Sequence, residues 1–195
     1  MTDETPTTSV HADWYRSFVP RDPDGCWYYA SLPAERPPGG RFDLKKPMGT
    51  CYWGESVEVA FRERIRRSGS QANSVPASLL GFVVTCRPVR ADDLVDLTHK
   101  DATKTTGVTG DVLAGRDYAA SRSLAEQWSA GYGGVHYNSR FALNHRAAAL
   151  FGECGEHAPR GDRELARLSG EEAAALLGIR VLPRRPRRGS VPIKK

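Results

Sequence analysis

Three residues whose side chains could bind a ligand or take part in a reaction follow one another at intervals of eleven positions: Arg41, Tyr52 and Glu63. An arginine offers a planar fork that matches phosphate or carboxylate oxygens. A tyrosine can stack on a flat ring, and a carboxylate can stabilise positive charge that develops during a reaction. Gly39 and Gly40 precede Arg41, and glycines allow the backbone to approach a ligand closely.

Three successive local elements are expected to carry these residues. Arg41 leaves the loop 21–40, which is rich in proline and glycine, and Tyr52 lies on a short aromatic strand over 49–54, bounded by glycines. Ser56 is placed to cap the helix that follows, and Gly69 is placed to end it. Glu63 falls beside the apolar stripe of that helix, at an edge from which a carboxylate can face a cleft. The stripe consists of Val57, Ala60, Phe61 and Ile65.

Taken singly, each of these residues has a simpler interpretation. Glu63 could be a solvated helix glutamate paired with an arginine of the segment FRERIRR. Arg41 could be a surface arginine, and Tyr52 a half-buried packing residue. Only their order and context favour a shared site.

The rest of the pattern predicts an α+β fold, because strands and helices mix without regular βαβ alternation. Strands are expected over 13–20, 79–89 and 91–98, a loop with a helical turn over 99–117, and an amphipathic helix over 118–131. A strand is expected from 133, followed before 152 by a second strand or a short helix. A helix over 169–178 with a capping box from Ser169 to Glu172 precedes a closing strand, IRVLP.

Composition divides the chain into three parts: a disordered N-terminus over 1–12, one domain over 13–183 and a basic, disordered tail over 184–195. The tail holds six of the 28 basic residues and none of the 23 acidic ones, so the remainder has a net charge of 22 − 23 = −1. A near-neutral body argues against a nucleic-acid-binding surface other than the tail. No apolar run is long enough to span a membrane, and the polar start does not resemble a secretion signal, so a cytoplasmic location is expected.

The four cysteines, Cys26, Cys51, Cys86 and Cys154, are scattered and are expected to be reduced thiols. Cys154 and His157 have a spacing that two zinc ligands could use, but no second pair completes a site, and no metal is expected. The sequence contains neither a P-loop nor a Rossmann glycine pattern.

Four segments follow one another in this order: WYRSF, GGRF, YWGES…FRE and GGVHYNSR…ALF. On these segments the chain resembles the RES domain, a family named for an arginine, a glutamate and a serine. The resemblance covers roughly residues 13–182. It implies an ADP-ribosyltransferase-like core, with NAD+ bound in a cleft between two small sheets and helices on the flanks. NAD+ would be a consumed substrate, and no cofactor is implied.

The resemblance also implies roles for individual residues. Glu63 would steady the ribose cation, Arg41 would hold the pyrophosphate or ribose oxygens, and Tyr52 would stack on the nicotinamide. Ser139 would hydrogen-bond the ligand or Glu63, unless it is simply a turn serine. Arg16 would hold the pyrophosphate or an attacking phosphate, unless it forms a structural pair. Ser56 is the remaining residue expected to bind the ligand.

RES domains are mostly toxins of RES–Xre toxin–antitoxin modules, so the resemblance implies an NAD+ glycohydrolase or phosphorylase that depletes NAD+, with an Xre-type antitoxin as partner. One alternative is a mono-ADP-ribosyltransferase that modifies a protein. Another is a non-enzymatic module whose basic tail binds nucleic acid or an acidic partner. Ser17, where some relatives have an aromatic residue, and the loop 99–117 depart from the family pattern.

Overall fold

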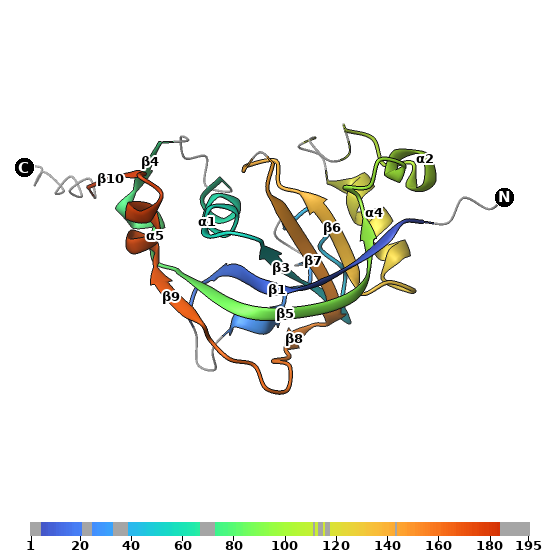
Figure 1. Cartoon of the computed structure of the whole chain (residues 1–195), viewed down its shortest axis with the longest axis horizontal. Helices are drawn as coiled ribbons and strands as arrows, with labels where there is room; N and C mark the ends of the chain where they lie inside the picture. Colours follow the sequence, from blue (N-terminus) through green and yellow to red (C-terminus); the bar gives the residue numbers. More distant parts are fainter. Residues whose placement is uncertain are drawn as a thin grey trace, which may run out of the picture.

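Two long antiparallel strands, β1 (Thr7–Phe18) and β5 (Val83–Asp96), form the spine of the molecule (Figure 1). They belong to a computed structural model that describes residues 5–20, 25–32, 39–66, 73–110, 112, 115, 118–142 and 144–183. Val10, Trp14 and Phe18 are buried at intervals of four along β1, as expected for one face of a strand. The edge strand β9 (Ala166–Ser169) pairs antiparallel with the start of β5.

A second group of strands consists of β3 (Met48–Gly54), β7 (Arg146–Glu153) and β6 (Gly134–Asn138), with β7 in the middle. The end of β5 joins this group through parallel pairing of Leu94–Asp96 with β6. β1 joins it at one residue pair, Tyr15 with Gly54. The six-stranded sheet therefore consists of two halves that are joined only over short stretches, which leaves room for a cleft between them.

Within the described residues, three helices cover this sheet. The helix α1 (Val57–Arg66) lies over the hollow side of the β1–β5 pair, and α5 (Gly170–Leu176) packs beside it (Figure 1). Their shared core contains Phe61, Ile65 and Phe82. The helix α4 (Ala119–Trp128) packs against β6, where Phe42 and Val135 are buried.

The middle strand β7 carries three consecutive alanines. Ala147, Ala148 and Ala149 are each at most 1% exposed. Ala147 and Ala149 belong to the core beneath α4, whereas Ala148 belongs to the core that contains Trp14 and Trp53. The alanines therefore separate two apolar clusters by little more than the backbone itself.

Short elements complete the described chain. The 3₁₀ turns are η1 (Gly25–Trp27) and η2 (Ala77–Leu79), and one short helix is α2 (Ala102–Thr106). Two-stranded sheets pair β2 (Tyr28–Tyr29) with β8 (Gly155–Glu156), and β4 (Ser74–Pro76) with β10 (Arg180–Leu182). In the part of the chain that the structure describes, no helix is long and apolar enough to cross a membrane.

The α+β class is confirmed, as are the 49–54 strand, the helix near 118–131 and the capping box of Ser169 and Glu172. The prediction of disorder over 1–12 is wrong for residues 7–12, which form half of β1 because Val10 packs in the core and the backbone pairs with β5. The two strands expected over 79–89 and 91–98 form a single strand, β5. The segment expected to be a second strand or a short helix before 152 is a strand, β7. The closing strand pairs with β4 outside the main sheet. Residues 1–4 and the tail 184–195 lie outside the described residues.

Candidate active site

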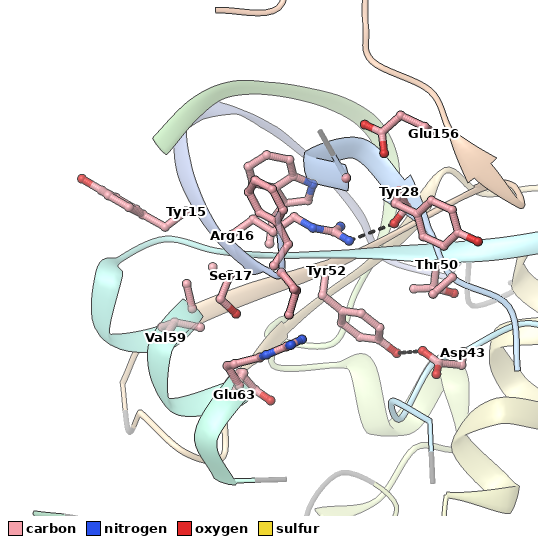
Figure 2. Close-up of a pocket in the computed structure, with 18 of the residues that line it drawn as sticks. Tyr15, Arg16, Ser17, Tyr28, Asp43, Thr50, Tyr52, Val59, Glu63 and Glu156 are labelled. Carbon is pink, nitrogen blue, oxygen red and sulfur yellow. Dashed lines mark hydrogen bonds between the residues drawn. The ribbon is translucent and has the colours of Figure 1, made fainter. Parts of the chain in front are cut away.

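A cavity of about 420 Å³ opens between the two halves of the sheet, a volume usual for small-molecule sites. The end of β1, the strand β3 and the helix α1 form its walls, and Figure 2 shows side chains from all three turned towards it. The polar residues of the wall include Arg16, Asp43, Tyr52, Glu63 and Glu156.

Glu63 projects from α1 into this cavity and is held by Ser139, which follows β6. The Ser139 hydroxyl donates a hydrogen bond of 2.9 Å to Glu63 Oε1. The same hydroxyl oxygen accepts hydrogen bonds from the backbone N–H groups of Phe141 and Ala142, at 3.2 and 3.3 Å. Because these donors occupy its lone pairs, the hydroxyl hydrogen is directed at the carboxylate. Ser139 is 3% exposed, so the hydroxyl end of this bond is shielded from water.

Tyr52 lies on β3, and its phenol is fixed by two hydrogen bonds. It donates to Asp43 Oδ1 at 2.8 Å and accepts from the Phe42 N–H at 2.9 Å. Asp43 is 5% exposed and also accepts a hydrogen bond from the Gly40 N–H. The dashed line in Figure 2 joins Tyr52 and Asp43 at the lower side of the cavity.

Gly40 is required by this arrangement, for a reason that the sequence does not reveal. A Cβ atom at this position would lie 2.4 Å from the Tyr52 hydroxyl oxygen and 2.7 Å from Asp43 Oδ1. The expectation was that Gly39 and Gly40 bring the backbone close to a ligand. The structure instead places Gly40 against the side chains that form the cavity wall.

Arg16, on β1, is held within the cavity wall by groups that carry no full charge. Its Nη2 donates to the Tyr28 carbonyl at 2.8 Å, and its Nη1 donates to the Cys51 sulfur (Figure 2). Burial raises the pKa of Cys51, although the nearby Arg16 opposes this effect, so Cys51 is a thiol at neutral pH. Among the described residues Arg16 forms no ion pair with a carboxylate, so its charge is available to an anionic ligand.

Arg41 and Ser56 are not among the described residues that line the cavity. The guanidinium carbon of Arg41 lies 5.8 Å from the centre of the Tyr118 ring, at the start of α4. Ser56 caps α1, as expected from its position, because its Oγ accepts from the Val59 N–H at 3.3 Å. Arg16, Tyr52 and Glu63 therefore share one cavity, and Ser139 reaches it through Glu63.

Sequence reasoning missed several residues of the cavity wall, namely Asp43, Tyr28, Tyr137 and Glu156. Asp43 lies two positions after Arg41, and only the fold shows that it turns back towards Tyr52. Tyr137 belongs to the HYNS segment and packs edge-on against Phe42, with 5.0 Å between ring centres. In the described part of the chain, no three His, Cys, Asp or Glu side chains gather in a way that could hold a metal ion.

The arrangement brings the oriented carboxylate of Glu63, the cation of Arg16 and aromatic rings to a single cavity. Such a set suits a substrate that has a flat ring, a sugar and a negatively charged part. A carboxylate held by a hydroxyl can stabilise positive charge on the sugar without reorganising.

Comparison with known proteins gives two findings. The family model described as "RES domain" matches residues 13–169. The fold is similar to a chain in the crystal structure of the M. tuberculosis MbcT–MbcA toxin–antitoxin complex, with a TM-score of 0.61 and 14% sequence identity. That match covers 87% of this chain and 91% of the other. No curated protein matches the chain.

Proposed function

Because the chain belongs to the RES domain family, whose model spans residues 13–169, we propose that it cleaves the nicotinamide–ribose bond of NAD+. It is then an NAD+ glycohydrolase if water accepts the ADP-ribose, or a phosphorylase if inorganic phosphate does. NAD+ is the substrate of this reaction and is consumed.

The observation that carries the proposal is the hydrogen bond of 2.9 Å from Ser139 to Glu63 at the wall of the cavity. In the reaction the C1′–N bond breaks, the bonding pair goes to the nicotinamide nitrogen, and positive charge grows on the ribose. Glu63, fixed by Ser139, stabilises that charge. An oxygen of water or phosphate then bonds to C1′, and with water a proton is released.

The remaining cavity residues receive roles that fit their geometry. Tyr52, whose ring is oriented by Asp43 and the Phe42 N–H, stacks on the nicotinamide and holds it for departure. Arg16, which has no carboxylate partner in the described chain, attracts a phosphate group. Arg41 belongs to the phosphate side of the substrate, away from the reacting bond.

We further propose that the protein is a toxin whose antitoxin is of the Xre type and covers the cavity. The support is the family and the fold shared with a chain of a toxin–antitoxin complex. Co-expression with the neighbouring gene tests this pairing. If growth arrest persists when both proteins are present, that gene does not encode the antitoxin.

The activity is tested by mixing the purified chain with NAD+ and identifying products by NMR and mass spectrometry, with and without phosphate. We expect nicotinamide, together with ADP-ribose or its 1-phosphate. Glu63→Gln keeps the shape but removes the charge, and it should lower the rate roughly 100- to 1000-fold. Glu171→Gln, an exposed change of the same type on α5, is the matched control and should leave the rate unchanged.

Two outcomes contradict the proposal: intact NAD+ after prolonged incubation with folded protein, or equal rates for the Glu63→Gln and Glu171→Gln variants. Adding labelled NAD+ to a lysate tests whether a protein, instead of water or phosphate, accepts the ADP-ribose. A labelled protein band would assign the chain to mono-ADP-ribosyltransferases.

A further inference from the structure

We infer that Arg41, Arg122 and Arg140, gathered around the ring of Tyr118, form a binding site for phosphoryl oxygens. The guanidinium carbons of Arg41, Arg122 and Arg140 lie 5.8, 5.5 and 5.5 Å from the centre of this ring. The three arginines come from distant parts of the sequence, and only the fold brings them together. We call them, with Tyr118, the arginine cluster.

Hydrogen bonds to neutral groups help to orient two members of the cluster. Arg122 Nε donates to the Gly40 carbonyl at 3.1 Å, and Arg140 Nη2 donates to the Tyr118 hydroxyl at 2.6 Å. Arg140 Nη1 donates to the Gly115 carbonyl at 2.9 Å. Each of these bonds orients a guanidinium without neutralising its charge.

Arg41 is the member whose state is hardest to explain without a ligand. It is 8% exposed, and within the described residues its guanidinium forms no hydrogen bond or ion pair. A buried charge without hydrogen-bond partners is costly. The face of the Tyr118 ring offsets part of this cost, about 0.5–2 kcal/mol for a typical cation–π contact. The buried Nη2 of Arg122 also has no partner among the described residues.

The start of α4 adds positive potential at the same place. Tyr118 is the N-cap of this ten-residue helix, and its side chain does not cap the backbone. The first turn holds no acidic residue, while Arg122 follows immediately. Positive charge near a helix N-terminus is unfavourable, whereas an anion there is stabilised. A bound anion would relieve the repulsion among the three arginines and complement the helix.

The geometry favours phosphoryl oxygens over a single carboxylate. Three forks that face one ring offer more N–H donors than one carboxylate can accept, whereas phosphate groups present several oxygens to arginine. The cluster also adjoins the cavity through the chain. Gly40, next to Arg41, packs against Tyr52, and Ser139, next to Arg140, holds Glu63. The ligand is therefore either the diphosphate of a dinucleotide in the cavity or free phosphate, and the first source rests on the proposed function.

The test is calorimetric titration of the whole chain with inorganic phosphate, inorganic pyrophosphate, ADP-ribose and, as a phosphate-free control, adenosine. We expect pyrophosphate or ADP-ribose to bind, and Arg122→Gln to weaken that binding at least tenfold. Arg90→Gln removes the same charge from an exposed position on β5, and it should leave the affinity unchanged. Arg122→Lys keeps the charge but not the fork, so its affinity should fall between those of the wild type and Arg122→Gln.

The response to each ligand identifies the source. If Arg122→Gln weakens ADP-ribose and pyrophosphate alike, the cluster holds the diphosphate of the dinucleotide. If only inorganic phosphate is affected, the cluster holds free phosphate. If Arg122→Gln lowers the melting temperature, Tyr118→Phe replaces it in the titration. This variant removes only the hydroxyl that orients Arg140, and it should also bind pyrophosphate more weakly than the wild type.

The inference is overturned if none of the phosphorylated ligands binds, or if Arg122→Gln and Tyr118→Phe bind them as the wild type does. NAD+ cleavage is measured separately on the same variants. Cleavage without phosphate binding at the cluster overturns only this inference, whereas phosphate binding without cleavage overturns only the proposed function.

Discussion

Tyr52 and Asp43 share a hydrogen bond of 2.8 Å between the phenol oxygen and Oδ1, and both residues line the cavity. The carboxylate is 5% exposed and joins the segment around Gly40 to the strand β3. The orientation of the aromatic ring is therefore set by a buried acid nine positions earlier in the chain.

The coupling between these two side chains can be measured in a double-mutant cycle. Tyr52→Phe removes the hydroxyl from Asp43 Oδ1 and from the Phe42 N–H, and Asp43→Asn removes the charge from the same bond. Each change should lower the free energy of unfolding by about 1–3 kcal/mol, and the double variant should lose less than the sum. Urea denaturation gives the values, with Tyr28→Phe, a more exposed tyrosine of the cavity, as the control. Strict additivity would show that the bond contributes nothing specific.

Ser139→Ala should lower kcat for NAD+ cleavage and leave KM nearly unchanged, because Ser139 positions Glu63. A hydrogen bond to a charged group contributes about 1.5–3 kcal/mol, which corresponds to a loss of roughly 10- to 100-fold. Ser139→Thr keeps the hydroxyl and should recover much of the rate. Ser123→Ala, exposed on α4, is the control. A rise in KM at constant kcat would show that Ser139 acts on substrate binding instead.

Gly40→Ala should lower the free energy of unfolding by about 1–3 kcal/mol, as overpacked buried sites do. The added methyl group would lie 2.4 Å from the Tyr52 hydroxyl oxygen, and the ring could move only by breaking its bond to Asp43. Gly81→Ala is the matched control, since nothing lies within 4 Å of a Cβ at that position. It should leave the stability unchanged or raise it by up to about 1 kcal/mol. Equal effects of the two substitutions would contradict this view of Gly40.

Asp96→Asn should destabilise the protein at neutral pH but not in acid. Burial acts to raise the pKa of Asp96, but hydrogen bonds from Thr98 and His136 outweigh it and lower the pKa. The carboxylate therefore contributes stability above its unfolded pKa of about 3.9, and this is lost as the pH falls through the lowered folded value. Denaturation of both proteins between neutral pH and pH 3 should show the difference shrinking below about pH 4. A difference in free energy of unfolding that stays constant with pH would refute the prediction. The control is Asp13→Asn, a change of the same type at an exposed position on β1.

Local signals were sufficient to predict the elements that carry the site. Glycines and aromatic residues mark β3, Ser56 marks the start of α1, and Ser169 with Glu172 marks the start of α5. Those features depend on residues within a few positions of one another. The placement of Glu63 beside the apolar face of its helix was also visible in the periodicity.

The contacts between distant segments could not be predicted. Asp43 reaches Tyr52 only because the chain turns back after Gly40, and Arg122 approaches Arg41 only because α4 packs beside that turn. Residues 7–12 were misjudged because a polar, threonine-rich segment is stabilised here by pairing with β5, with only Val10 buried. Strand pairing over such distances leaves no short-range signal in the sequence.

The run of alanines in β7 limits how this molecule can change. Ala147 and Ala149 face one apolar layer and Ala148 faces another, all with at most 1% of their surface accessible. A bulkier substituent at any of these positions would displace the apolar side chains packed on that face of the sheet that carries Tyr52 and Tyr137. A change of ligand preference is therefore expected at the cavity residues of α1 and the end of β1 rather than in β7.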